Sequence, residues 1–138
     1  MEETIQDIAN EDLTTTYLEK KWGCTFRRFG AYSPIDFSLH KNGKLIAVAE
    51  FKRRHRTRTE FDDIYLNLQK WMSLQFTSLG LEVPGLFIVA FNDGIFWCDI
   101  ATIDPSDHRV TGRTDRGRKA DIQPVIKIPT GVMIDARL

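Results

Sequence analysis

Apolar residues recur at helical spacing in two parts of the chain. The first stripe covers residues 10–21, where we expect a helix that begins after Asn10 and ends before Gly23. A longer stripe covers residues 59–79 and predicts one continuous amphipathic helix. Thr59, with an acid three residues later, resembles a capping box at the start of this helix, and a glycine after its last apolar position supplies the stop.

Strand-like segments lie between and after these helices. The first group comprises CTFRRF, residues 35–40 and residues 44–52, and the second group, after the second helix, comprises GLFIVAF and IFWCDI. The chain is then polar and basic until IQPVIKI, where Pro124 puts a last strand at a sheet edge or delays its start. The predicted fold is therefore α/β, an α+β mixed sheet with flanking helices, in a single domain over residues 1–138.

Position parity gives more detail in the stretch SPIDFSLHKNGKLIAVAEFKRR, residues 33–54. Successive side chains of a strand point to opposite faces, and every odd position of the two strands is apolar. The odd positions are therefore predicted to face a core. The even positions carry Asp36, Glu50 and Lys52 to the other side of the sheet.

The turn between these two strands decides whether their apolar positions share a face. A two-residue Asn-Gly turn would set odd positions opposite even ones. A three-residue loop over residues 41–43, with Gly43 as a left-handed bulge, keeps the apolar positions together, and we therefore predict that loop. In the resulting register Asp36 lies opposite Val48, with Glu50 as its diagonal neighbour.

Two carboxylates so placed suggest a cation site. They raise each other's pKa unless a cation lies between them, and oxygen ligands suit Mg²⁺ or Mn²⁺. Lys52, two residues beyond Glu50, returns to the same face, where its ammonium can steady an attacking hydroxide or the charge on a phosphorus centre. The alternative is a strand end at solvent, with Glu50 and Lys52 as ordinary surface charges.

Charge is unevenly distributed although the formal net charge is zero. Six acids and no base precede Lys20, whereas residues 52–58 hold five bases and no acid. A third block, residues 109–119, holds five bases against one acid. This distribution favours a basic face for a polyanionic partner, and the alternative is two solvated loops rich in arginine.

Composition and hydropathy exclude several classes of protein. With 42% hydrophobic and 28% charged residues, the chain has ordinary globular composition and not that of a disordered segment. No apolar run approaches the ~20 residues of a membrane span, and the acidic N-terminus lacks the apolar core of a secretory signal. Cys24 and Cys98 match no metal spacing and are expected to be small buried hydrophobes. A cytoplasmic protein with no membrane association is the expectation.

In its motifs and its order of elements the sequence resembles the PD-(D/E)xK nuclease superfamily, especially the small archaeal Holliday-junction resolvases and short phage-encoded nucleases. The matching motifs are Pro34-Ile35-Asp36 and Glu50-Phe51-Lys52. The likeness covers about residues 10–100, and residues 101–138 add the basic loop and last strand. It implies a restriction-endonuclease-like α-β-β-β-α-β core with helices flanking a central mixed sheet. Ile35 separates the proline from the aspartate, a departure that the family's variable first motif tolerates.

The resemblance implies hydrolysis of phosphodiester bonds in DNA with Mg²⁺, for which Mn²⁺ could substitute. Asp36 and Glu50 would hold the metal together with the Phe51 carbonyl, and Lys52 would orient or activate the water. Resolvase-like members also carry a glutamate on the first helix that points into the site. Glu11 is our candidate, and the alternatives on the same helix are Asp12 and Glu19. If a phage encodes the enzyme, it would act in the host cytoplasm.

A polar residue on the second helix often lies near the metal in this family. Gln69 and Lys70 fit that location, and Gln69, which flanks the apolar stripe, is the residue we assign to the site. The arginines that follow Lys52, together with the basic block near residue 117, are the expected nucleic-acid contacts because arginine suits bidentate phosphate binding. These residues are Arg53, Arg54, Arg56, Arg58, Arg116, Arg118 and Lys119.

Three functions remain open at this stage. The leading hypothesis is a metal-dependent DNA endonuclease that reads structure or free ends, because no base-reading motif is present. As a homodimer, such a small chain could cut two strands symmetrically. The second hypothesis is a catalytically inactive nucleic-acid-binding or protein-interaction module of the same fold. The third is a structural or interaction protein whose arginine loops contact other proteins.

Overall fold

The computed structural model describes residues 5–30, 33–104, 106, 108–112 and 122–138. Arg116, Arg118 and Lys119, which were expected to contact nucleic acid, lie outside these ranges. The elements are α1 (Ile5–Trp22), β1 (Thr25–Arg28), β2 (Phe37–Lys41), β3 (Lys44–Arg53), β4 (Asp63–Asn67), α2 (Leu68–Leu81), β5 (Gly85–Phe91), β6 (Gly94–Asp99), η1 (Ile100–Thr102), β7 (His108–Gly112), β8 (Ile122–Pro129), η3 (Thr130–Val132) and β9 (Ile134–Asp135).

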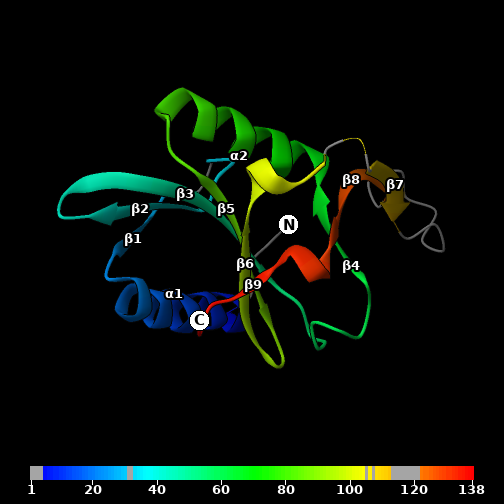
Figure 1. Cartoon of the computed structure of the whole chain (residues 1–138), viewed down its shortest axis with the longest axis horizontal. Helices are drawn as coiled ribbons and strands as arrows, with labels where there is room; N and C mark the ends of the chain where they lie inside the picture. The colour runs from blue at the N-terminus through cyan, green and yellow to red at the C-terminus, as the bar shows by residue number, and fades with distance from the viewer. Residues whose placement is uncertain (1–4, 31–32, 105, 107, 113–121) are drawn as a thin grey trace.

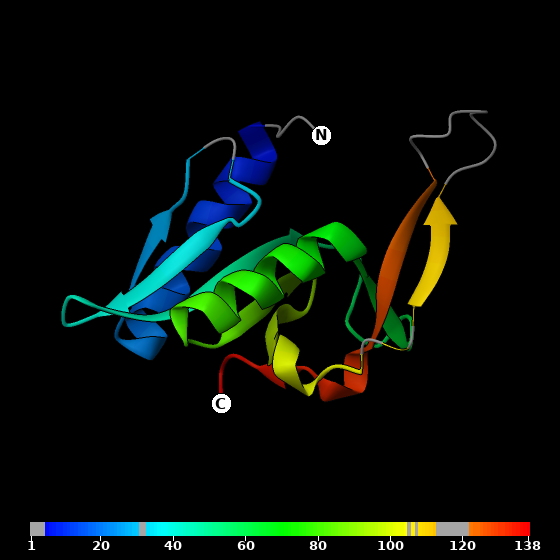
Figure 2. The ribbon, with the colours of Figure 1, turned by 90° about the horizontal axis from the view of Figure 1, so that it is seen from above.

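A mixed sheet lies between the two helices (Figure 1). Within the described residues it has six strands in the order β1-β2-β3-β5-β6-β9, with β3 and β5 parallel and the other neighbours antiparallel. Helix α1 covers one face and α2 the other (Figure 2). The predicted α/β fold with helices flanking a central mixed sheet is therefore confirmed.

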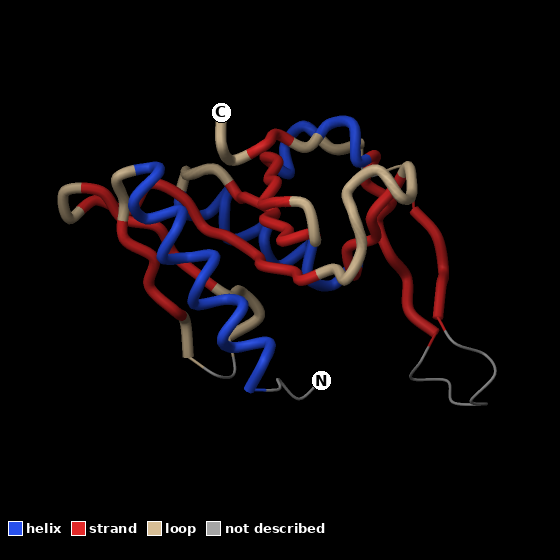
Figure 3. The backbone as a smooth tube through the Cα atoms, turned by 90° about the horizontal axis from the view of Figure 1, so that it is seen from below, coloured by secondary structure: helices blue, strands red, loops and turns tan. Residues whose placement is uncertain are grey.

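A second sheet, in the order β4-β8-β7, extends from one side of this body. Its strands β7 and β8 leave the body as a two-stranded arm (Figure 3). Pro124 lies within β8 opposite Val110 of β7, just beyond the last pair between β8 and β4, Val125 with Asn67. A proline is tolerated there because β4 does not extend far enough to need its missing N–H. No helix among the described ranges is long and apolar enough to cross a membrane.

Both faces of the central sheet are buried. The odd positions of β2 and β3, among them Phe37, Leu39 and Ala49, pack with Leu18 of α1 as parity predicts. The even face, which parity left mixed, is covered by α2 and contains the fully buried Val48. Glu50, on the even face where β3 is buried, is therefore removed from water, and this determines the chemistry of the site.

The turn between β2 and β3 differs from the predicted bulged loop. Asn42 and Gly43, with φ of 52° and 76°, form a two-residue turn between the paired Lys41 and Lys44. Left-handed φ at both central residues is typical of a type I′ hairpin. The predicted three-residue loop is wrong, because the extra residue is inside the strand.

That extra residue is Ile46, which forms a β-bulge. His40 pairs with Leu45, whereas Leu39 pairs with Ala47, so Ile46 has no partner in the register. The bulge returns odd positions opposite odd ones and pairs Phe37 with Ala49. Continued by one residue, this register brings Asp36 beside Glu50 and not, as predicted, beside Val48.

The predicted helix over residues 59–79 is wrong in its first half. Residues 63–67 form β4, in which Ile64 and Leu66 are buried at a spacing of two and pair with β8. Helix α2 begins only after Asn67, whose side chain accepts from the N–H groups of Gln69 and Lys70 at 2.9 and 3.3 Å. The capping box predicted at Thr59 is therefore not used.

The first helix is longer than predicted. It starts at Ile5, so Asn10 lies inside it and is not the N-cap. Its end is as expected, with Gly23 at φ +64°, the left-handed conformation common after a last helical turn. Cys24 and Cys98 are both free thiols, and burial raises the pKa of Cys98 to about 12.

Replacing Asn67 by alanine should lower the free energy of unfolding by about 1 kcal/mol, because two N–H groups of the first turn of α2 lose their acceptor. Urea denaturation measures the loss, and Asn67→Asp should retain most of the stability. Thr59→Ala is the matched control and should be neutral, since Thr59 is exposed and caps no helix. A larger loss at Thr59 than at Asn67 would contradict the observed helix start.

Candidate active site

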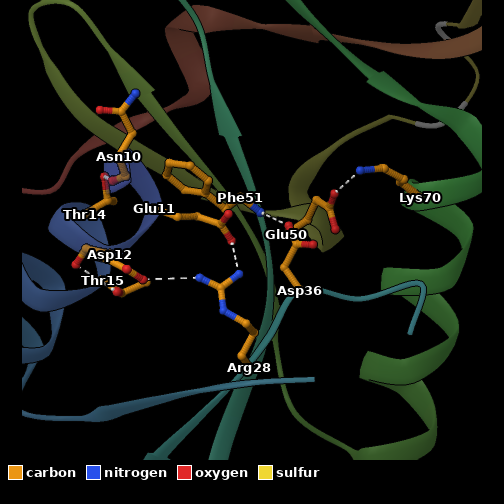
Figure 4. A network of polar contacts seen from close by, with 10 residues as sticks. All are labelled: Asn10, Glu11, Asp12, Thr14, Thr15, Arg28, Asp36, Glu50, Phe51 and Lys70. Carbon is orange, nitrogen blue, oxygen red and sulfur yellow. Dashed lines mark hydrogen bonds and ion pairs between the residues drawn. The ribbon is translucent and has the colours of Figure 1, made fainter. Parts of the chain in front are cut away.

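Asp36 is fixed between two strands at the entry to β2. Its Oδ2 accepts from the N–H of Phe51 in β3 at 2.9 Å, and its backbone carbonyl accepts from the N–H of Phe29 at 3.0 Å. Figure 4 shows the Asp36 carboxylate beside Glu50. The structure therefore brings together two acids from different strands, as the even-face pattern predicts.

Glu50 is the most deeply buried acid of the site. Its side chain is 1% exposed, and its Oε1 lies 2.8 Å from Nζ of Lys70 in α2 (Figure 4). Burial first and the nearby charge of Asp36 second raise the pKa of Glu50 to about 7, against the opposing effects of Lys70 and Lys52. A carboxylate kept in this position favours the approach of additional positive charge.

Lys52 lies on the same side of β3, two residues beyond Glu50. Burial lowers the pKa of Lys52 to about 8, and the positive charges of Arg54 and Lys70 act in the same direction. The charges of Glu50 and Asp36 oppose this shift. Lys52 is therefore an amine that can exchange its proton near neutral pH.

Lys70, and not Gln69, reaches the acids from the second helix. Gln69 is exposed and lines a shallow groove of about 410 Å³ between α2 and β8, together with Met72 and Phe76. The assignment of Gln69 followed from a helix assumed to run from Thr59. With the cap at Asn67, Lys70 occupies the first turn that faces β3, and this cap was the sequence signal that could have identified it.

The three candidate acids of the first helix, Glu11, Asp12 and Glu19, have different surroundings. Glu11 is buried and its Oε1 pairs with Nη1 of Arg28 at 3.1 Å, whereas the exposed Asp12 pairs with Nη2 at 3.3 Å. Glu19 accepts from the N–H of Phe26 at 2.8 Å, at the start of β1. In Figure 4 the Glu11 carboxylate lies next to Phe51, on the other side of β3 from Lys70.

The donor set can be compared with the needs of a divalent metal. Among the described side chains no three His, Cys, Asp or Glu groups gather closely enough to hold an ion, so Glu11 does not complete a set with Asp36 and Glu50. The two carboxylates nevertheless fit a metal with oxygen ligands, because each raises the energy of the other's charge and Glu50 is removed from water. Phe51, whose carbonyl is the expected third ligand, is half-buried.

The four arginines after Lys52 are largely engaged within the protein. Arg53 donates to the carbonyl oxygens of Arg54 and Ala90 and to Oδ1 of Asn92. Arg56 and Arg58 likewise donate to main-chain carbonyls. In the described part of the chain no carboxylate lies within ion-pair distance of these four side chains. They therefore fix local structure mainly through hydrogen bonds to main-chain carbonyls.

The chain matches a known protein family in sequence and a solved structure in fold. A family model described as "Phage putative PDDEXK endonuclease" matches residues 1–134. The chain belongs to this family. Among solved structures, the Holliday junction resolvase Hjc of Archaeoglobus fulgidus matches with a TM-score of 0.62 at 13% sequence identity, over 91% of this chain and 87% of that one. No curated protein matches the chain.

These findings confirm the family resemblance and the fold. The PDDEXK endonuclease family covers both motifs, Pro34-Ile35-Asp36 and Glu50-Phe51-Lys52, and supports an endonuclease. Hjc, at so low an identity, supports the resolvase-like fold alone.

Proposed function

We propose that this PDDEXK-family endonuclease hydrolyses phosphodiester bonds in DNA with Mg²⁺, guided by branched structure or free ends and not by base sequence. The observation that carries the proposal is the convergence of Asp36, Glu50, Lys52 and Lys70 at one end of β3. A buried acid and a half-buried one beside two lysines suit a metal and a phosphate better than they suit a stable core.

In this proposal Asp36 and Glu50 hold the Mg²⁺ together with the Phe51 carbonyl, and Mn²⁺ could replace it. When bound, the cation neutralises phosphate charge and makes a coordinated water more acidic. Asp36 is held by the N–H of Phe51, so its carboxylate is oriented before any ligand arrives. Burial of Glu50 keeps bulk water away from the same ion.

Lys52 positions the attacking water or the phosphate through Nζ. As an ammonium it donates to an oxygen of the phosphate or of the water, and its lowered pKa lets it release a proton near pH 8. Hydrolysis forms a bond from the water oxygen to phosphorus and breaks the bond to the leaving oxygen. One proton leaves the water in this step and one reaches the leaving group.

Glu11 is proposed as a positioning residue. Its carboxylate holds the guanidinium of Arg28, which lies 5.1 Å above the ring of Phe37. Phe37 directly follows Asp36, and the N–H of Phe29, the residue after Arg28, binds the Asp36 carbonyl. Loss of Glu11 would therefore loosen the segment that carries Asp36.

Nuclease assays on supercoiled, single-stranded and four-way DNA test the proposal. Cleavage should require Mg²⁺ or Mn²⁺ and stop in EDTA. DNA binding that weakens at high salt, with no cleavage of any substrate, would instead favour a binding module of the same fold. A homodimer, measured by analytical ultracentrifugation, would suit paired cuts, and the proposed place of action of a phage enzyme is the host cytoplasm.

Lys70→Met should reduce cleavage about tenfold at pH 7 and shift the acidic limb of the pH–rate profile to higher pH. The reason is that Lys70 lowers the pKa of Glu50, so without it the carboxylate ionises at higher pH. Gln69→Met is the matched control on the neighbouring exposed position and should behave like the wild type. Unchanged pH–rate profiles for both variants would exclude Lys70 from the site.

A further inference from the structure

Phe61 is an exposed aromatic residue that is held in place. Its ring is 60% exposed, and the guanidinium of Arg56 lies 4.7 Å from the ring centroid. The Phe61 carbonyl accepts from Oγ1 of Thr130 at 3.2 Å, so the residue is also anchored through its main chain. The ring therefore offers solvent a face that is already oriented.

Arg56, which backs this ring, is itself fixed. Its Nη2 donates to the carbonyl of Asp63 at 2.8 Å, and its guanidinium lies 5.7 Å from the centroid of the buried Phe91. The main-chain carbonyl of Arg56 accepts from the N–H of Asn92 at 2.9 Å. Arg56 is therefore placed between a buried and an exposed ring and makes the exposed ring part of a positively charged site.

A row of cations connects the catalytic acids with this ring. The N–H of Arg54 binds the carbonyl of Ala90, so the pairing of β3 with β5 continues past Arg53. Side chains at positions 50, 52 and 54 then share one side of the strand, and the chain bends before Arg56. Lys52 and Arg54 each have a pKa lowered in part by the next cation of the row, which agrees with this arrangement.

We propose that the exposed face of Phe61, backed by Arg56, binds an unpaired nucleobase of the substrate by stacking. The inference rests on the proposed function, since it takes the strand to be cut at Asp36 and Glu50. Phosphates of that strand would follow Lys52 and Arg54, and a base a few nucleotides from the cut would reach the ring. Every base has a π-face, so such stacking needs no sequence and selects single-stranded segments, as in a flap or a branch.

A paired duplex does not present a base in this way, because both faces of each base are stacked on neighbours. A protein partner is the competing occupant of an exposed phenylalanine. Lys52, Arg54 and Arg56 have no described carboxylate within ion-pair distance, and three such cations in a row favour a polyanion at this position over a protein surface. The substrate class is therefore DNA with unpaired nucleotides next to the cleaved bond.

Fluorescence anisotropy in EDTA tests the proposal without requiring cleavage. The probes are a labelled duplex with a single-stranded tail and the fully paired duplex of the same sequence. Phe61→Ala should weaken binding of the tailed probe roughly tenfold and change binding of the paired probe less than about twofold. Phe61→Trp should retain tail binding, whereas Phe61→Leu should behave like the alanine variant. Phe76→Ala is the matched control, since Phe76 is 65% exposed on α2, away from the cation row.

An abasic-site scan of the tail gives the position of the contact. Removal of the base at one tail position should weaken binding to the wild type but not to Phe61→Ala, because loss of that base and loss of the ring remove the same interaction. Equal losses on both probes, no loss on either, or the same loss in Phe76→Ala would overturn the proposal. Cleavage in Mg²⁺ is measured separately: tail binding that depends on Phe61 without cleavage would refute the nuclease and keep the stacking site, and the reverse result would refute only the stacking site.

Discussion

Replacing Asp36 by asparagine is expected to lower Mg²⁺-dependent cleavage by on the order of a thousandfold while leaving the fold intact. Asparagine has nearly the same shape, and its Oδ1 can still accept from the N–H of Phe51, which the Asp36 carboxylate does at 2.9 Å. The variant loses only the negative charge proposed to hold the cation next to Glu50. Initial rates on the best wild-type substrate, measured over a range of Mg²⁺ concentrations, give the size of the effect.

Asp99→Asn is the matched control for this experiment. Asp99 caps η1 by accepting from the N–H of Ala101 at 3.0 Å, and asparagine caps a helix equally well. The same chemical change outside the site should therefore leave cleavage within about twofold of the wild type. If Asp36→Asn retained wild-type activity at all Mg²⁺ concentrations, the proposed metal site would have to be abandoned.

The two acids of the site could be predicted from sequence because parity survives an error in the turn. The sequence pattern requires the apolar positions of β2 and β3 to share a face. This requirement holds whichever turn or bulge brings the two strands into that register. The chain uses a two-residue turn and a bulge at Ile46, where we predicted a three-residue loop. The predicted loop and the observed bulge each add one residue to a plain two-residue hairpin. Asp36, Glu50 and Lys52 therefore lie on the same side of the sheet in either case.

The second helix could not be delimited in the same way. Apolar residues at 61, 64, 65 and 68 fit a helical stripe, but Ile64 and Leu66 also alternate as in a strand. The choice between these patterns depends on β8, which lies about 60 residues later and supplies the partner of β4. Local periodicity carries no information on such a partner, and the error led to the choice of Gln69, whereas Lys70 is the residue that contacts Glu50.

The arginine segment shows a different limit of sequence reasoning. A run of arginines after a catalytic lysine predicts phosphate contacts, but it does not show which side chains the fold uses for itself. Arg53 spans the ends of β3 and β5, and Arg58 donates to Thr130 and lies 5.0 Å from the ring centroid of Phe96. Because these partners are distant in sequence, only the folded chain separates structural arginines from those directed toward the site.

The metal-free protein is expected to lose stability as the pH rises from 5 to 7.5, and Glu50→Gln should remove this loss. Unfolded, the Glu50 carboxyl loses its proton near its ordinary pKa of 4.5, but in the folded protein the pKa is raised to about 7, first by burial and then by Asp36. Between these values the folded state binds more protons than the unfolded state, so the free energy of unfolding falls with pH.

The effect reaches at most about 3 kcal/mol above pH 7, because each pKa unit corresponds to about 1.4 kcal/mol. Lys52 contributes little in this window, since with a pKa lowered to about 8 it is still mostly protonated in both states up to pH 7.5. In Glu50→Gln, Lys70 no longer faces a carboxylate at position 50, but its side chain is 44% exposed and its ammonium can be hydrated. Urea denaturation in EDTA at several pH values should therefore give a flat profile for the variant.

Added Mg²⁺ gives the same prediction a second outcome that does not depend on activity. A cation held by Asp36 and Glu50 would bind the folded wild-type protein and not its unfolded chain. It would therefore raise the melting temperature of the wild type at pH 7.5, where Glu50 must be charged. Glu50→Gln should gain little. Two results would contradict the prediction: a metal-free wild type as stable at pH 7.5 as at pH 5, or equal stabilisation of both proteins by Mg²⁺. Either result would mean that the charged form of Glu50 is not destabilised by its burial beside Asp36 and does not bind the cation.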